Sequence, residues 1–467
     1  MNQDIDNNAN EPEFVKIGTA PAMVFDDAVY LFDRLDRNIT YHPIENIARL
    51  NPDQLPEQSP LPYTPGEARN IFEAIIIPTT SCNLRCCYCY LGDNIGLDVH
   101  ENQIPCLISA LLNLSGDRDI SFYFFGGEPS LAESFIRKFI HQVELIRDTN
   151  PPKCFSFGLA TNGTLHPKFL TFLLKQGFYF SVSIDGPRSM HDRTRMRLDG
   201  SSCASQVEEC IRTIASSGAN LRTRTTITQD SLAEMPAIVN YLSNLGAKVV
   251  HFEPLNPYPK LENARNLCKR PTAVAFVTCL KKAIGEARKK NVSVSATMFH
   301  KFLFPSRYMC EGMSGHRIAI SPHGIVSRCA EIQHYAHPLT KLFCAGSVKP
   351  EGCLNLNNDY LQNKILSVEN SYLNLDKCLR CFAQSTCAGG CPAHNYQATG
   401  SAFIVDPFHC DTTREILKFL LHRILKKTLP PDHNKLCRAP EKYPMRLPRE
   451  FFLYGKKPNQ QEGESKF

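Results

Sequence analysis

The sequence lacks the features of a membrane-spanning or exported protein. No apolar run reaches the ~20 residues that a transmembrane helix needs, so no contact with a membrane is expected. The first residues, Met1 to Glu13, are polar and acidic and contain no apolar core of a secretory signal. No segment recurs at a fixed period, which argues against a repeat architecture. These absences predict a globular cytoplasmic protein.

Composition and charge give little more. The chain has 467 residues, enough for two or three domains, with 43% hydrophobic and 21% charged residues. The net charge is +6, and much of it lies after Lys418 in a tail rich in lysine and arginine. A solvated basic end explains this tail better than a nucleic-acid site does.

Cysteine, in contrast, is abundant. The chain has 20 cysteines and no export signal, so we expect a reducing cytosol and not a disulfide framework. Ten of them fall in two constellations with spacings typical of metal ligands. The other ten, which include Cys106, Cys154, Cys279 and Cys344, lie mostly in apolar runs, where buried free thiols are expected.

The first constellation is a C-x3-C-x2-C motif formed by Cys82, Cys86 and Cys89. Three thiolates on one tight loop can hold three irons of a [4Fe–4S] cluster and leave the fourth iron open, whereas electron-transfer ferredoxins use four cysteines per cluster. A zinc ribbon is disfavoured because the paired C-x2-C halves are missing. Cys87 is off the spacing and is expected to be a bystander.

The pattern around this motif predicts an α/β fold. Six apolar, β-rich runs alternate with amphipathic segments of helical period between residues 71 and 304. The runs are 71–78, 120–125, 154–160, 178–184, 221–228 and 247–254. A complete barrel needs eight such units, so six predict an open, partial (β/α)6 TIM-like barrel with its site at the C-terminal strand ends. The first cysteine motif directly follows the first strand.

The rest of the chain divides into three further segments. Residues 1–70 are expected to hold a hairpin (28–33 with 39–42), a short helix near 44–50 and a proline-rich linker at 51–66. Residues 305–425 are dense in cysteine and glycine and end in an amphipathic helix over 412–427. Residues 426–467 form the basic, proline-containing tail.

A glycine-rich turn, Gly126-Gly127-Glu128-Pro129, stands at the end of the second predicted strand. The glycines would let a ligand approach the backbone closely. Backbone carbonyls there, with Glu128 nearby, can accept hydrogen bonds from an ammonium group.

The cysteine motif followed by Gly-Gly-Glu-Pro resembles radical S-adenosylmethionine enzymes, whose fold is a partial six-unit barrel. The resemblance implies that S-adenosylmethionine chelates the open iron and is cleaved by an electron from the reduced cluster. The resulting 5′-deoxyadenosyl radical abstracts a hydrogen atom from the substrate. The electron donor would be a protein such as flavodoxin or ferredoxin. Polar residues at later strand ends, namely Asn162, Ser183 and Arg195, are expected to contact the cofactor, while Asp185 is either a direct participant or part of a turn.

The second constellation contains seven cysteines. They are Cys310, Cys329, Cys378, Cys381, Cys387, Cys391 and Cys410, with Gly324 before the second. Structural zinc explains these seven cysteines poorly, because two four-coordinate zinc sites need eight ligands. The spacing resembles the SPASM extension of radical S-adenosylmethionine enzymes, which carries two auxiliary [4Fe–4S] clusters.

By that resemblance, four of these cysteines hold a distal cluster: Cys378, Cys381, Cys387 and Cys410. Cys310, Cys329 and Cys391 supply three ligands to a proximal one. His316 stands where some members have a further cysteine; it either ligates iron or is a hydrogen-bonding histidine.

Three functions remain open at this point. The leading one is a maturase that crosslinks or otherwise modifies a ribosomally made peptide. The N-terminal hairpin is then either a binding site for a leader peptide or a cap that only closes the barrel. The second is the anaerobic sulfatase-maturing (formylglycine-generating) branch, which typically has an aspartate base directly after the second auxiliary cysteine. Here Ala330 and Glu331 follow Cys329, so Glu331 is a possible substitute. The third is a non-catalytic iron–sulfur electron carrier, which the first cysteine motif and the glycine-rich turn disfavour.

Overall fold

The protein was examined as a computed structural model. It describes residues 13–17, 20–25, 28–33, 38–43, 71–91, 96–147, 154–256, 268–297, 299, 308–357, 375–429 and 441–445. The predicted helix near residues 44–50 and the predicted linker at 51–66 lie outside these ranges. None of the described helices is both long and apolar enough to cross a bilayer.

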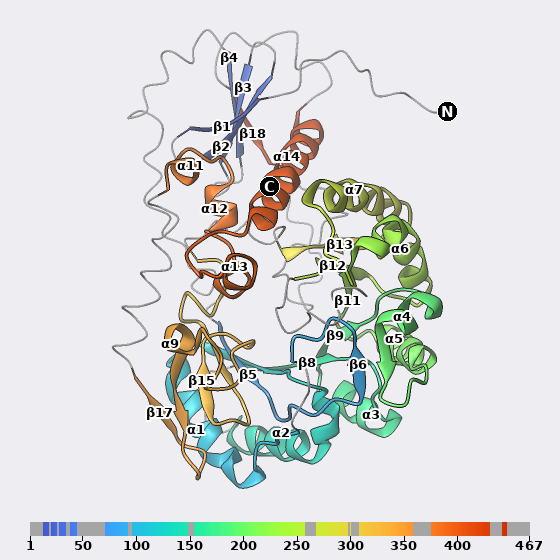
Figure 1. Ribbon diagram of the computed structural model, residues 1–467, viewed down its shortest axis with the longest axis vertical. Coiled ribbons are helices and arrows are strands. Elements are labelled where there is room, and N and C mark those ends of the chain that lie inside the picture. Colours follow the sequence, from blue (N-terminus) through green and yellow to red (C-terminus); the bar gives the residue numbers. More distant parts are fainter. Residues whose placement is uncertain are drawn as a thin grey trace.

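A curved parallel sheet forms the centre of the molecule (Figure 1). Its parallel strands are β5 (Ile71–Ile76), β7 (Asp119–Phe124), β8 (Phe155–Thr161), β9 (Tyr179–Ser183), β11 (Leu221–Ile227), β12 (Val249–Pro254) and β13 (Ser293–Ser295). The first six coincide with the six apolar runs of the sequence. The short edge strand β13 was not predicted, because three residues carry too little pattern.

Helices connect the strands and cover the outer face of this sheet (Figure 1). They are α1 (Ile104–Ser115), α2 (Glu133–Arg147), α3 (Pro167–Lys175), α4 (Arg188–Thr194), α5 (Ala204–Ser216), α6 (Met235–Asn244) and α7 (Ala273–Lys289). The helix α2 shows why the layers hold together: its Phe139 packs edge-on against Phe122 and Phe124 of β7. Each of these rings is fully buried, which contributes roughly 2–3 kcal/mol per side chain.

The cysteine-rich segment extends the same sheet. Strand β14 (Arg317–Ile320) pairs in parallel with β5, and β15 (Ile325–Ser327), β16 (Cys344–Val348) and β17 (Leu354–Leu356) follow antiparallel. Gly324 makes the β14–β15 turn, where its φ of 72° favours glycine. The remaining helices are α9 (Thr340–Phe343), α11 (Asp376–Leu379), α12 (Gln384–Cys387), α13 (Pro392–Thr399) and α14 (Pro407–Thr428). The predicted fold class, an α/β partial barrel with a small N-terminal segment and a C-terminal cysteine-rich unit, is confirmed.

A second, smaller sheet joins both ends of the chain. It contains β1 (Glu13–Ile17), β2 (Ala20–Phe25), β3 (Ala28–Asp33), β4 (Asn38–Pro43) and β18 (Glu441–Pro444) in that order, all antiparallel. The predicted hairpin is therefore present as β3 and β4. Its expected exposed edge is not, because β2 pairs with β3 on one side and β18 with β4 on the other. The sheet lies next to α14 and α12 (Figure 1), where Phe14 packs against Phe382.

Candidate functional site

The first cysteine motif lies on the loop after β5, at the C-terminal edge of the parallel sheet. Part of this loop, β6 (Leu84–Cys86), pairs antiparallel with β10 (Arg195–Arg197), so the loop is attached to the fourth βα connection. Cys82, Cys86 and Cys89 are all partly buried. Burial raises the pKa of the Cys86 thiol to about 12; Arg195 opposes this, and charge on Cys89 and Cys82 adds to it. The three thiols are therefore electrostatic neighbours, and bound iron would supply the positive charge that their thiolates need.

The glycine-rich turn is pressed against the start of this loop. Gly127 N–H donates to the Thr79 carbonyl at 3.2 Å, and Glu128 N–H donates to the Ser81 carbonyl at 2.8 Å. A Cβ at Gly127 would collide with the carbonyl oxygens of Thr80 and Ser81. The sequence suggested that the glycines admit a ligand; in the structure they admit the backbone of the cysteine loop itself.

Glu128 is fully buried and acts as a brace between strand ends. Its Oε1 accepts from Ser130 N–H (3.1 Å) and Thr161 Oγ1 (2.9 Å), and its Oε2 accepts from Asn162 N–H (2.7 Å). Burial raises the pKa of Glu128, and these hydrogen bonds partly offset that rise. Pro129 begins the short 3-10 helix that follows, at Pro129–Ala132. The carboxylate thus holds the third strand end in register with the second.

Asn162 continues this chain of contacts to the cysteine loop. Its Nδ2 donates to Asn83 Oδ1 at 2.9 Å and lies 3.9 Å from Cys82 Sγ. Its Oδ1 accepts from the N–H and the hydroxyl of Thr164. The predicted site residue Asn162 is therefore beside the first thiol, where it orients the loop.

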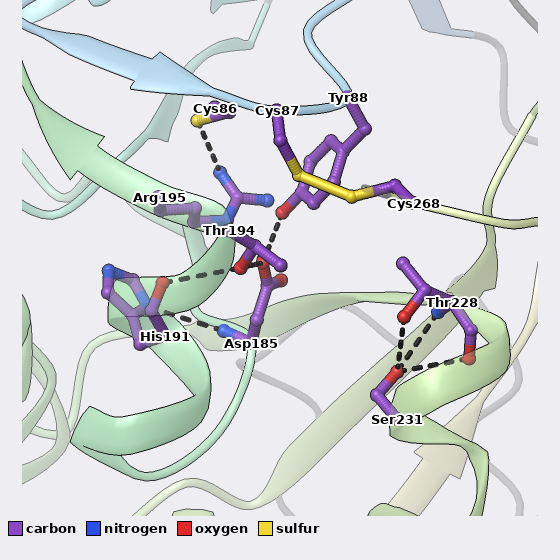
Figure 2. Close-up of a disulfide and its surroundings, with 10 residues drawn as sticks. All are labelled: Cys86, Cys87, Tyr88, Asp185, His191, Thr194, Arg195, Thr228, Ser231 and Cys268. Carbon is purple, nitrogen blue, oxygen red and sulfur yellow. Dashed lines mark hydrogen bonds and ion pairs between the residues drawn. A yellow bond between two sulfur atoms is a disulfide. The ribbon is translucent and has the colours of Figure 1, made fainter. Parts of the chain in front are cut away.

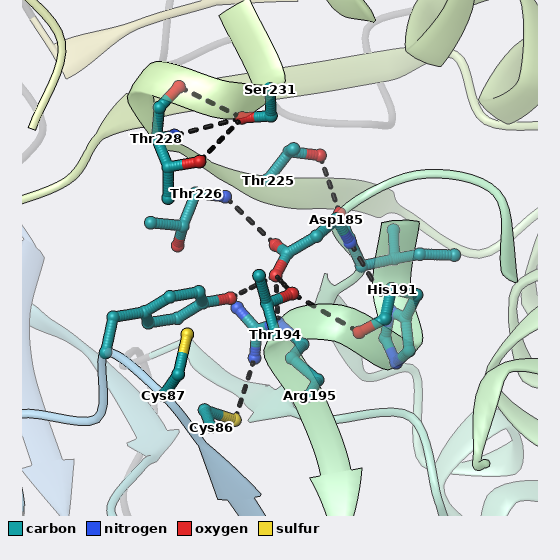
Figure 3. A network of polar contacts seen from close by, with 12 residues as sticks. Cys86, Cys87, Asp185, His191, Thr194, Arg195, Thr225, Thr226, Thr228 and Ser231 are labelled. Carbon is teal, nitrogen blue, oxygen red and sulfur yellow. Dashed lines mark hydrogen bonds and ion pairs between the residues drawn. The ribbon is translucent and has the colours of Figure 1, made fainter. Parts of the chain in front are cut away.

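Asp185 and Arg195 form a buried ion pair under the same loop (Figures 2 and 3). Arg195 Nε donates to Asp185 Oδ2 at 3.0 Å, and Arg195 Nη1 lies 3.9 Å from Cys86 Sγ. The Tyr88 hydroxyl, from the cysteine motif, also donates to Asp185 Oδ2. The sequence left two interpretations for Asp185: a direct participant in the site, or only part of a turn. A turn alone does not account for these side-chain contacts.

Cys87 is not a bystander: it forms a disulfide with Cys268 (Figure 2). The bond joins the cysteine loop to the segment just before α7, next to Tyr88 and Leu255. The partners are 181 residues apart in sequence, so no spacing pattern indicated the pair. The expectation of buried free thiols for the ten remaining cysteines is wrong for these two, and it is also wrong for Cys154, whose thiol is free but exposed.

A second polar group lines the later strand ends. Ser183 is the last residue of β9, and it is half-buried and in register with Arg224 of β11. Arg224 in turn lies 4.0 Å from Glu253 of β12, which also accepts from Thr297 Oγ1 at 2.7 Å. Burial favours a raised pKa for Glu253, but the hydrogen bond from His251 and the charge of Arg224 lower it to about 2. Arg224 keeps an exposed fraction of 47%, so a cation remains accessible at this rim.

The proximal cysteines face the barrel across Tyr90. Burial raises the pKa of Tyr90, and charges on Glu331, Cys89 and Cys329 raise it further, so this tyrosine lies between the two cysteine sets. Gln333 Nε2 donates to its hydroxyl at 3.1 Å. Burial also raises the pKa of Cys391, with contributions from the charges of Glu331 and of its neighbours Cys329 and Cys310. The structure therefore brings together the three predicted proximal ligands.

Glu331 lies between these thiols and the barrel. Its Oε1 is 3.1 Å from His394 Nε2, which is also 3.2 Å from Asn256 Nδ2 of the loop after β12. Burial would lower the pKa of His394, but Glu331 raises it above the ordinary value. Glu331 and His394 thus form a hydrogen-bonded pair where the loop after β15 meets the loop after β12.

The four distal cysteines also converge. Burial raises the pKa of Cys387 to about 12, and charge on Cys410, Cys381 and Cys378 contributes to that rise. Cys410 is on the first turn of α14, and Cys378 is on α11. This set is nearer to the surface than the proximal one, since Leu379 beside it is 45% exposed.

The donor sets are dominated by thiols, the ligands that iron–sulfur clusters use. Within the residues that the structure describes, no three His, Cys, Asp or Glu side chains lie close enough to hold one metal ion. The Nδ1 atom of His316 is 3.1 Å from Ser314 Oγ.

Sequence reasoning missed four contributors to this site: Tyr88, Asn83, His394 and Cys268. Tyr88 carried a signal, because it stands inside the cysteine motif. The other three act through contacts between residues at least 63 positions apart. No local pattern marks such contacts.

Comparison with known proteins agrees with this geometry. Residues 76–242 match the sequence family described as the Radical SAM superfamily. The chain is 26% identical over 259 residues to a cysteine-type anaerobic sulfatase-maturating enzyme of Clostridium perfringens, a match that covers 53% of this chain and 62% of that relative. It is 24% identical over 373 residues to a serine-type anaerobic sulfatase-maturating enzyme of Klebsiella aerogenes, covering 75% and 85% of the two chains.

A solved structure shares the fold. The structure of anSMEcpe with bound AdoMet and Cp18Cys peptide superposes with a TM-score of 0.61 at 20% identity. The superposition covers 76% of this chain and 98% of the other.

Proposed function

Since residues 76–242 form a radical SAM domain, we propose that this chain cleaves S-adenosylmethionine reductively and modifies a peptide or protein substrate. When bound, a [4Fe–4S] cluster and S-adenosylmethionine supply one electron and a radical that abstracts a hydrogen atom. Cys82, Cys86 and Cys89 would hold that cluster. The seven later cysteines would hold two auxiliary clusters.

One observation carries the proposal: the cysteine loop and the proximal set approach one another at a single partly buried tyrosine, Tyr90. Tyr90 is adjacent to Cys89 in sequence and is held by Gln333 of the cysteine-rich segment. A substrate placed between the two sets would be shielded from water on both sides, which protects a radical from side reactions. The glycine-rich turn and Asn162 then hold the loop at a fixed distance from the strand ends.

Glu331 and His394 supply what the oxidation of a substrate residue needs after hydrogen abstraction. Such a residue must still lose a proton and an electron. A carboxylate 3.1 Å from His394 Nε2 can accept the proton, and the imidazole stabilises the carboxylate by hydrogen bonding. The adjacent proximal cysteines would hold an acceptor for the electron.

The same pair favours a second candidate, formylglycine formation on a cysteine or serine. The relatives from Clostridium perfringens and Klebsiella aerogenes carry names of that activity. No aspartate follows Cys329 directly, since Ala330 occupies that position. Glu331 comes two residues after Cys329, and its partner His394 also contacts Asn256 of the loop after β12. This position supports Glu331 as a substitute base.

Leader-peptide binding would use a different edge from the one expected. Both edges of the β3–β4 hairpin are paired, so among the described strands a peptide strand could add at the outer edge of β1 or β18, or in place of β18. Deletion of residues 1–66 should then lower the affinity for a precursor peptide. An unchanged affinity would remove this role.

The test of function is anaerobic incubation with S-adenosylmethionine and dithionite, followed by co-expression with short peptides encoded beside the gene. 5′-Deoxyadenosine is expected in the first experiment, and a peptide that has lost two hydrogen atoms in the second. A hydrazide-reactive aldehyde would favour the second candidate. If the clusters are intact and no 5′-deoxyadenosine forms in the presence of substrate, the enzyme hypotheses fail and a non-catalytic iron–sulfur electron carrier is the hypothesis that remains.

The variant Glu331→Gln separates the cleavage of S-adenosylmethionine from the modification of the peptide. It should leave 5′-deoxyadenosine formation in the absence of peptide unchanged, while the yield of modified peptide falls at least tenfold. The matched control is Glu351→Gln, an exposed position in the same segment. Equal product yields from both variants would contradict the assignment of Glu331.

A further inference from the structure

A buried cation lies against one thiol of the cysteine loop. The Arg195 side chain is only 10% exposed, and its Nη1 is 3.9 Å from Cys86 Sγ, within hydrogen-bonding reach of sulfur. Its guanidinium carbon lies 5.2 Å from the centroid of the Tyr88 ring. Residue 195 is held there by backbone pairing, since it is the register partner of Cys86 in the β10–β6 ribbon.

Asp185 fixes this arginine in place and balances its charge. The Asp185 side chain is 4% exposed, and four donors converge on it. Oδ2 accepts from Tyr88, from Thr194 Oγ1 at 2.7 Å and from Arg195 Nε at 3.0 Å, while Oδ1 accepts from Thr226 N–H at 3.1 Å. Figure 3 shows Asp185 between Thr226 of β11 on one side and Thr194 and Arg195 on the other.

We propose that Arg195 is a positioning residue that raises the reduction potential of the cluster held by Cys82, Cys86 and Cys89, with Asp185 opposing it. The inference rests on the proposed function, because it requires a cluster on this loop. A cluster that takes one electron from its reductant gains negative charge. A buried cation and an N–H donor at a ligand sulfur stabilise that reduced form, and a nearby carboxylate destabilises it.

This role differs from contact with the cofactor. Contact with S-adenosylmethionine would change the affinity for it and would leave the potential of the cofactor-free cluster unaltered. A charge that acts on the ligand sulfur changes the potential before any S-adenosylmethionine is added. The two charges of the pair also have opposite effects, which general damage to the loop would not reproduce.

The experiment is a redox titration of the anaerobically loaded protein without S-adenosylmethionine, monitored by electron paramagnetic resonance. The signal of the cluster on this loop is assigned separately by its change when S-adenosylmethionine is added. Arg195→Gln should shift the midpoint potential to more negative values, and Arg195→Lys should shift it less because the charge remains. Asp185→Asn should shift it to more positive values. Arg188→Gln is the control, since it removes a charge from the exposed Arg188–Asp192 pair of the neighbouring α4.

Shifts of opposite sign in the arginine and aspartate variants support the inference. If Arg195→Gln fails to load iron, Arg195→Lys replaces it in the comparison with Asp185→Asn. The midpoint potentials of these two variants should then shift in opposite directions. Potentials equal to those of wild type and Arg188→Gln, or shifts of one sign in both variants, would overturn it. A wild-type protein whose cluster signal does not respond to S-adenosylmethionine would overturn the proposed function and this inference with it.

Discussion

Replacing Glu128 by glutamine should loosen the cysteine loop, although Glu128 touches none of the three cysteines. Its carboxylate accepts three hydrogen bonds, from Ser130 N–H, Thr161 Oγ1 and Asn162 N–H. Glutamine keeps the shape but has only one oxygen. Whichever way its amide faces, one buried backbone N–H is left opposite another donor.

The size of the effect follows from these contacts. An unsatisfied buried N–H costs about 1–3 kcal/mol, and hydrogen bonds to a neutral acceptor are about 1 kcal/mol weaker than those to a charged one. The lower cost of burying a neutral amide offsets part of this. We expect a net local loss of about 3 kcal/mol, which corresponds to roughly a hundredfold change in the opening equilibrium.

Hydrogen exchange of the metal-free protein measures this opening directly. The peptide that contains Asn162 should exchange about a hundredfold faster in Glu128→Gln than in wild type. Iron loading should also fall, because Asn162 orients Asn83 and Cys82. Glu133→Gln is the control, since Glu133 forms an exposed i,i+4 pair with Arg137 that is worth about 0.5 kcal/mol. Exchange in Glu128→Gln equal to that control would refute the role of Glu128 as a brace.

Three further predictions concern other parts of the chain. Alkylation without reduction should leave Cys87 and Cys268 unlabelled and joined in one crosslinked peptide; labelling of both would contradict the pairing. Burial lowers the pKa of His251 from 6.5 to about 4, so its contribution to stability is present above pH 6.5 and is lost as the pH falls toward 4. His251→Gln should therefore flatten the dependence of the unfolding free energy on pH between these values. An unchanged slope of unfolding free energy against pH would contradict this. Deleting residues 430–467 removes β18 and should destabilise the small sheet by roughly 2 kcal/mol. The β3–β4 hairpin should then be cleaved faster by a protease than in the full chain. Equal cleavage rates in the two proteins would argue against the pairing of β18 with β4.

The sequence was sufficient for those parts of the fold that depend on local pattern. Most of the first six strands were recognisable because they are largely buried and read as nearly continuous apolar runs, whereas β11 alternates buried and more exposed side chains with a period of two. The C-x3-C-x2-C spacing predicted the first ligand set from one short stretch of chain, whereas the two later sets were predicted from the resemblance to the SPASM extension. The strand pattern and the first cysteine motif are local signals, so neither needs knowledge of which segments meet.

Contacts between distant segments were beyond prediction. β18 pairs with β4 across about four hundred residues, and Cys268 reaches Cys87 across 181. Glu128 was predicted to bind the cofactor; its hydrogen bonds to Thr161 and Asn162 could not be predicted, because they form only when β7 and β8 lie in register. Arg195 was expected at the cofactor as well, and its contact with Cys86 depends on the β10–β6 pairing.

The most direct test of the central claim compares two adjacent cysteines. Anaerobically loaded Cys86→Ala and Cys87→Ala are incubated with S-adenosylmethionine and dithionite, and 5′-deoxyadenosine is quantified. Cys87→Ala should still form it, because Cys87 is outside the ligand spacing and is paired with Cys268. Cys86→Ala should form none. Equal 5′-deoxyadenosine from the two variants, or none from wild type with its iron loaded, would contradict the assignment of this loop as the radical-generating site.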